Sequence, residues 1–150
     1  MTERRLRLVT ALVAVLGLAV AGYLTYVHYA ELEPLCVGGG GGCERVQSSD
    51  YAELAGIPVA VLGFAGYALI LASLWVPGDA GRVGGALLAL VGFGFSIYLT
   101  WVELFEIDAV CQWCVVSAVL MTVLALTTTW RLVQATPGEP PIRNRGAPDE

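Results

Sequence analysis

Residues 110–130 read VCQWCVVSAVLMTVLALTTTW, an apolar run that contains no charged side chain. A helix needs about 20 predominantly apolar residues to cross the hydrocarbon core of a bilayer, and this run is long enough. Three further runs are comparable, at residues 8–29, 58–76 and 83–102. Open strands cannot satisfy their backbone hydrogen bonds in lipid, so each run should be a helix. The sequence therefore predicts an all-α membrane protein built as a four-transmembrane-helix bundle.

The overall composition supports this prediction. Of the 150 residues, 57% are hydrophobic and 14% are charged, and the mean hydropathy is +0.71. Such a chain is too apolar for a water-soluble domain, and its apolar runs leave too little length for a soluble enzyme with a large cleft. The net charge of −5, with no lysine, lacks the basic surface of a nucleic-acid-binding protein. We expect membrane lipid, and no nucleic acid, as a partner.

The arginines predict the orientation, because the cytoplasmic flanks of membrane helices collect positive charge. Seven of the eight arginines lie before the first run, between the second and third, or after the fourth. The connections 30–57 and 103–109 hold only Arg45 and are otherwise acidic. We therefore expect a multi-pass protein of the inner or plasma membrane. Both termini would be cytoplasmic, and these two connections would be extracytoplasmic.

One catalytic domain is expected over residues 1–133, with residues 30–57 as its largest extramembrane loop. Within this loop, Tyr51–Ala55 is expected to form a short amphipathic helix. Residues 134–150 are polar and proline-rich, which predicts a disordered cytoplasmic tail. A competing interpretation makes the first run a cleaved signal peptide, with residues 19–21 (AVA) as the cleavage site. The run is longer than a usual signal core, which favours a retained helix.

Four cysteines lie on the predicted outer side. Cys36 and Cys43 follow the first run, and Cys111 and Cys114 open the fourth. Disulfides persist on that side because the compartment is oxidising. Residues 111–114, CQWC, form a C-x-x-C motif at the start of a predicted helix, where the dipole and the unpaired N–H groups favour a thiolate. Because the thiolate is the attacking species in disulfide exchange, the pattern favours redox chemistry.

Two other interpretations of the cysteines are weaker. A zinc site would need closer spacing than Cys36 and Cys43 have, and His28 is the single histidine, so no metal is expected. A structural clip would close a loop of five glycines, 38–42, and would stabilise the fold by only about 2–3 kcal/mol. Glycines maximise backbone freedom. We therefore favour a mobile pair that meets an outside protein and then the C-x-x-C motif.

Further motifs surround the cysteines. Residues 43–49 read CERVQSS, Gly63 and Tyr67 form a Gly-x-x-x-Tyr, and residues 96–101 read SIYLTW. Together with the order of the cysteines, these motifs resemble the vitamin K epoxide reductase family, including its bacterial members that drive disulfide-bond formation. They match its Cys-x-Arg-Val-x-Ser-Ser, Gly-x-x-x-Tyr and Ser-x-Tyr-Leu-x-Trp, and the resemblance extends over about residues 8–131.

The chain departs from the family in two respects. The vertebrate members have Thr-Tyr-Ala shortly after the C-x-x-C, whereas residues 115–118 here read VVSA, with Ala118 at the tyrosine position. This difference weakens the expectation of vitamin K epoxide as natural substrate and of inhibition by coumarins. Some bacterial relatives carry a fused thioredoxin-like domain, whereas this chain ends after a short tail. A separate extracytoplasmic thioredoxin-fold thiol oxidase is therefore expected as partner.

The resemblance implies a thiol relay. The reduced partner attacks a Cys36–Cys43 disulfide at Cys36, and the released Cys43 attacks Cys111 of a Cys111–Cys114 disulfide. Cys114, freed as a thiolate at the helix N-terminus, passes the electrons to a membrane quinone, either menaquinone or ubiquinone. The residues implied to lie near the quinone are Ser49, Val59, Gly63, Tyr67, Tyr98 and Cys114.

Alternatives to these roles stay open. Ser49 could instead cap the expected helix at Tyr51–Ala55, and Tyr67 and Tyr98 could be ordinary packing aromatics. The same relay could end on vitamin K epoxide. From a different class, the chain could be a non-enzymatic membrane scaffold whose two disulfides stiffen its outer face.

Overall fold

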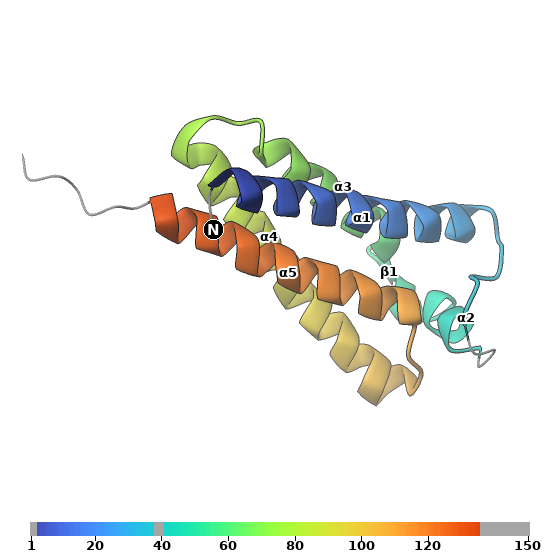
Figure 1. The fold of residues 1–150 in the computed structure, drawn as a ribbon. Helices are drawn as coiled ribbons and strands as arrows, with labels where there is room; N and C mark the ends of the chain where they lie inside the picture. Colours follow the sequence, from blue (N-terminus) through green and yellow to red (C-terminus); the bar gives the residue numbers. More distant parts are fainter. Residues whose placement is uncertain (1–2, 38–40, 136–150) are drawn as a thin grey trace, which may run out of the picture.

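The computed structural model describes residues 3–37 and 41–135. Its long helices lie alongside one another (Figure 1), and they are α1 (Glu3–Tyr29), α3 (Val59–Ser73), α4 (Gly78–Val102) and α5 (Gln112–Ala135). α4 continues through a π-helical turn at Glu103–Ile107. The all-α membrane fold predicted from the sequence is confirmed.

Three of these helices are long and apolar enough to cross a membrane: α1, α4 with its π-helical turn, and α5. α3 is apolar but has 15 residues. At a rise of 1.5 Å per residue it spans about 22 Å, less than the ~30 Å hydrocarbon core. The helix is short because Pro58 precedes it in a strand and the chain turns after Ser73. A count of four spans therefore stays a prediction.

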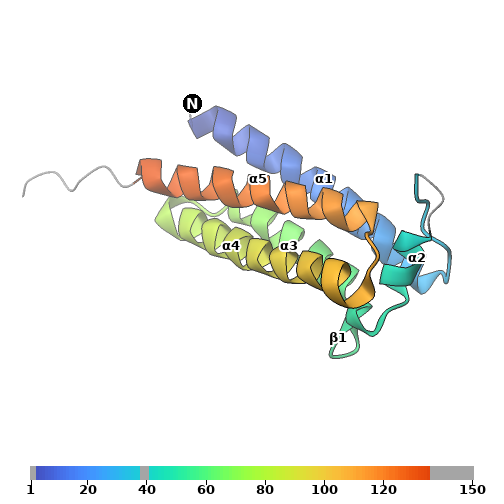
Figure 2. The same cartoon turned by 90° about the horizontal axis from the view of Figure 1, so that it is seen from below.

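The helices pack as a bundle in which α1 and α4 each contact both α3 and α5 (Figure 2). Tyr67 is the largest fully buried side chain at the centre. Its ring lies against Gly17 of α1, where a Cβ would overlap the ring atoms. Its hydroxyl donates a hydrogen bond of 2.9 Å to the Ser117 carbonyl oxygen. Tyr67 thereby connects α1, α3 and α5.

Short elements cap one end of the bundle. They are α2 (Gly42–Gln47), a 3₁₀ turn (Asp50–Ala52), and a hairpin of β1 (Glu53–Leu54) and β2 (Ile57–Pro58). The expected helix at Tyr51–Ala55 was wrong. Ala55 and Gly56 both have positive φ, 53° and 78°, which makes a tight hairpin turn instead of a helical one. The short helix of the loop is α2, which buries Cys43 and Val46 and exposes its charged residues.

The described arginines lie at the opposite end of the bundle, except for Arg45, which lies in α2. Figure 1 shows the start of α1 and the end of α5 at one end, with α2 at the other. Arg131 pairs with Glu3 at 2.8 Å, and Arg7 donates to the Leu74 carbonyl oxygen. Residues 38–40 of the glycine run, and 136–150 of the expected tail, lie outside the described residues.

Candidate active site

The four cysteines form one group at the capped end of the bundle. Cys36 and Cys43 are joined by a disulfide with a Cα–Cα distance of 6.3 Å. Cys111 and Cys114 are free thiols. Cys43 and Cys111 are both fully buried in one apolar cluster, and Cys36 and Cys114 pack against it. The loop disulfide and the C-x-x-C thiols are therefore immediate neighbours. In the described ranges, 3–37 and 41–135, no set of three His, Cys, Asp or Glu residues is arranged to hold a metal ion.

Cys111 caps the N-terminus of α5. Its carbonyl oxygen accepts the N–H of Val115 at 3.0 Å, and its sulfur accepts the backbone N–H groups of Trp113 and Cys114. A hydrogen bond from the Cys114 thiol and these N–H groups lower the pKa of Cys111 to about 7, against the opposing effects of burial and of Glu103. In the dithiol form the helix N-terminus therefore favours a thiolate on Cys111.

The two middle residues of the C-x-x-C hold the loop in place. Val37 N–H donates to Gln112 Oε1 at 3.1 Å, and Gln112 Nε2 donates to the Leu35 carbonyl oxygen at 3.3 Å. The same carbonyl oxygen accepts Trp113 Nε1 at 2.8 Å. These bonds bind the backbone on both sides of Cys36. The motif therefore supplies a clamp for the loop as well as two thiols.

Close backbone contact brings α2 onto the same site. A Cβ added to Gly42 would lie 2.6 Å from the Val110 carbonyl oxygen, which is too short for any real contact. Gly42 directly precedes Cys43, and Val110 directly precedes Cys111. A glycine is therefore required at position 42 for the two buried cysteines to approach one another.

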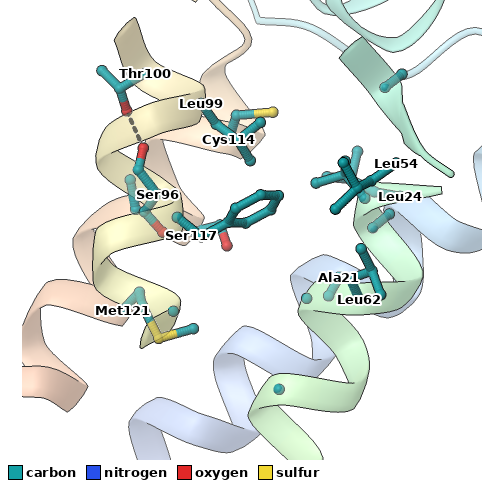
Figure 3. A pocket seen from close by; sticks show the side chains of 18 of the residues that line it. Ala21, Leu24, Leu54, Leu62, Ser96, Leu99, Thr100, Cys114, Ser117 and Met121 are labelled. Carbon is teal, nitrogen blue, oxygen red and sulfur yellow. Dashed lines mark hydrogen bonds between the residues drawn. The ribbon is translucent and has the colours of Figure 1, made fainter. Parts of the chain in front are cut away.

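A cavity of about 350 Å³ lies between the helices beside Cys114. In Figure 3, Cys114, Ser96, Ser117 and Met121 line one side of it, and Leu24, Leu54, Leu62 and Ala21 line the other. Its wall is mainly apolar, and the volume is in the range of small-molecule sites. The polar groups in the wall are few: the hydroxyls of Ser49, Tyr51, Tyr67, Ser96, Thr100 and Ser117, the Gln47 amide, the Glu103 carboxyl and the Cys114 thiol.

Comparison with known proteins agrees with this geometry. Residues 8–129 match the vitamin K epoxide reductase family. The chain belongs to this family. A thiol-disulfide oxidoreductase of Arabidopsis thaliana, LTO1, is 42% identical over 50 residues. The matched stretch is 33% of this chain and 13% of that relative, so the chain corresponds to only a small part of its length. All four clustered cysteines lie within the stretch that matches the family.

Most of the residues implied by the vitamin K epoxide reductase resemblance line the cavity. Besides Cys114, they are Ser49, Val59, Gly63 and Tyr67. The Ser49 hydroxyl donates to the Val46 carbonyl oxygen at 2.7 Å and makes no helix-capping bond. Ser49 therefore does not have the alternative capping role considered for it.

Tyr98 is the exception. It is 48% exposed, stacks on Phe95, and is absent from the cavity wall. The wall-lining residues of α4 recur at helical spacing, as Leu88, Val91, Gly92, Phe95, Ser96, Leu99, Thr100 and Val102, and Glu103 of the π-helical turn continues the series. Tyr98 lies about 100° around the helix from Leu99 and so points away from the cavity. The structure does not bring Tyr98 into this cavity wall, and its predicted contact with a quinone stays a prediction.

Sequence reasoning missed Glu103. This residue is only 5% exposed, and its Oε2 accepts the Cys111 N–H at 3.1 Å. Its carboxyl group also hydrogen-bonds the Cys114 thiol. The available signal was an acidic residue directly at the end of an apolar run, eight positions before the C-x-x-C. Ionisable side chains that are buried within a membrane protein are commonly functional.

Proposed function

We propose that this protein is a membrane thiol:quinone oxidoreductase that reoxidises an extracytoplasmic thioredoxin-fold oxidase. The observation that carries the proposal is the continuous path from the loop disulfide to the cavity. Cys36 and Cys43 adjoin Cys111, and Cys114 follows on the cavity wall. A non-enzymatic scaffold would not require the cysteines of the C-x-x-C motif to border an apolar cavity.

The loop pair is suited to take electrons from an outside protein. Leu35 and Val37, on either side of Cys36, are 75% and 90% exposed, whereas Cys43 is fully buried. A partner thiolate would therefore attack at Cys36 and release Cys43 toward the interior. Cys43 then attacks the sulfur of Cys111 and breaks a Cys111–Cys114 disulfide, which frees Cys114. The partner's second thiol attacks its own bond to Cys36 and leaves oxidised. The released Cys36 attacks Cys43, so the loop disulfide is restored and Cys111 and Cys114 are left as thiols.

The cavity suits a flat apolar ring that carries two carbonyl oxygens. Leucines and phenylalanine supply apolar contact, and the Ser96 hydroxyl is available as a donor. A quinone bound there would accept two electrons and two protons. Cys114 is the cysteine on the wall and is therefore the residue that delivers the electrons. Ala118 also lines the wall, which leaves open space where the vertebrate members have a tyrosine.

We propose the inner or plasma membrane as the location, with the cysteines on the extracytoplasmic side. The described arginines other than Arg45 are separated from the cysteine end of the bundle, which supports this orientation. It also supplies the oxidising compartment that a loop disulfide requires.

The test is a purified protein in lipid nanodiscs, mixed with a reduced thioredoxin-fold oxidase and one of menaquinone, ubiquinone or vitamin K epoxide. Quinol formation with a quinone supports the proposal. Turnover only with vitamin K epoxide would show that the epoxide, and not a quinone, is the electron acceptor. Cys114→Ala should abolish quinol formation while the partner still reduces the loop disulfide, as thiol labelling would show. Cys36→Ala should block the partner. When fully pre-reduced with dithiothreitol, however, it should still yield quinol from Cys111 and Cys114. Normal quinol formation by Cys114→Ala would refute the relay.

A further inference from the structure

Glu103 stands out among the residues around the cavity because it combines burial with contact to the reacting sulfurs. It lies where α4 passes into the π-helical turn, an irregularity common at functional sites. Within the described part of the chain it is the one carboxyl group in the cavity wall. The serine and threonine hydroxyls there do not exchange protons readily near neutral pH, whereas a carboxyl group does.

The contacts of Glu103 place it between the two thiols and the cavity. One oxygen holds the Cys111 N–H at 3.1 Å, and the carboxyl group hydrogen-bonds the Cys114 thiol. The Cys114 proton therefore has two acceptors, the Cys111 sulfur and the Glu103 carboxylate. When the sulfurs join as a disulfide, only the carboxylate remains to take it.

The charged groups around Glu103 leave its carboxyl group able to take up and release a proton. None of the ion pairs formed by the described residues includes it. The titratable groups that face it are Cys111 and Cys114 from α5 and, around the cavity, Tyr51 and Tyr67. No arginine lies in the described cavity wall to fix the carboxylate in a permanent salt bridge.

We propose that Glu103 carries protons from the C-x-x-C thiols to the electron acceptor in the cavity. This inference rests on the proposed quinone reduction. Oxidation of Cys111 and Cys114 forms one S–S bond and releases two electrons and two protons, and conversion of a quinone to a quinol consumes both. Glu103 takes the proton of Cys114 as its electrons leave and gives it to one acceptor oxygen. The Glu103 carboxylate, now without a proton, then takes up the second proton. This proton comes from the Cys111 thiol, directly or through a water molecule, and passes to the other oxygen of the acceptor.

The test uses Glu103→Gln in the full-length protein, because a glutamine oxygen can still accept the Cys111 N–H but cannot carry a proton. Fully reduced, dithiothreitol-free protein is mixed with menaquinone in a stopped-flow instrument. We expect the first equivalent of quinol to form at least a hundredfold more slowly than in wild type, in the range of lost acid–base catalysis. Wild type should show a pH-dependent rate, and the variant a flatter profile. Glu103→Asp should recover part of the rate.

Two further measurements separate proton transfer from a structural role. Transfer from the loop to the C-x-x-C, followed by thiol trapping without quinone, should not slow in Glu103→Gln, because loss of the carboxylate charge makes Cys114 a better leaving group. The alkylation midpoint of Cys111 should move to lower pH, because a negative charge that raises its pKa has been removed. An unshifted midpoint, equal loss of thiol transfer, or a quinol rate within twofold of wild type would each overturn the inference. If wild type reduces no quinone, the proposed function itself fails.

Discussion

Replacing Gly42 with alanine tests how closely the two redox segments must meet. A Cβ at this position would lie 2.6 Å from the Val110 carbonyl oxygen, whereas ordinary contacts begin at 3.4 Å. The obstacle is backbone, so it cannot rotate aside. α2 would have to move away by several tenths of an ångström and carry Cys43 with it.

The expected effect is larger on the reaction than on the fold. Overpacking of this kind costs about 1–3 kcal/mol of stability. A misplacement of about 1 Å between reacting groups can cost roughly a hundredfold in rate. For a shift of about half that size, we expect transfer from Cys43 to Cys111 to slow by about tenfold.

A single-turnover assay separates the two steps. Protein with all four thiols reduced should yield two equivalents of quinol. The first reports the chemistry of Cys111 and Cys114, and the second reports reoxidation of the loop pair through Cys43. Gly42→Ala should leave the first phase unchanged and slow the second. Gly94→Ala is the matched control, since a Cβ there has no neighbour within 4 Å. If both phases of Gly42→Ala keep their rates, or both slow equally, the close approach does not govern the transfer.

Three further outcomes are expected. Gln112→Ala removes two hydrogen bonds to the loop backbone, worth about 1–3 kcal/mol together, and should speed amide hydrogen exchange at Val37; unchanged exchange would contradict the clamp. Alkylation of reduced Cys111 should follow its thiolate, rising with pH about a midpoint near 7 and falling away below it, whereas a midpoint near the ~8.5 of a free cysteine would contradict the stabilising donors. In a cysteine-free background, an impermeant reagent should label Ser48→Cys in sealed cells and Asp79→Cys only after the membrane is opened; the reverse pattern would invert the orientation.

The helices and the pairing of the C-x-x-C cysteines near the start of a helix could be predicted from the sequence, because both depend on local patterns. An uncharged apolar run must form a helix in lipid wherever its neighbours lie. The C-x-x-C spacing places Cys111 and Cys114 within one turn of whatever helix follows. No comparable local pattern in the sequence predicted the β1–β2 hairpin. Only the positive φ of Ala55 and Gly56 distinguishes it from the expected helical turn.

The roles within the site were decided by the tertiary structure, since they depend on contacts between distant segments. Which thiol receives the helix N–H groups follows from where α5 begins, and the helix starts one residue after Cys111. Glu103 reaches both thiols because the chain reverses between the π-helical turn and α5. Tyr98 belongs to a matching motif yet faces outward, because the rotation of α4 in the bundle chooses which residues meet the cavity. Sequence fixes the chemistry of each side chain, and packing fixes which of them share a site.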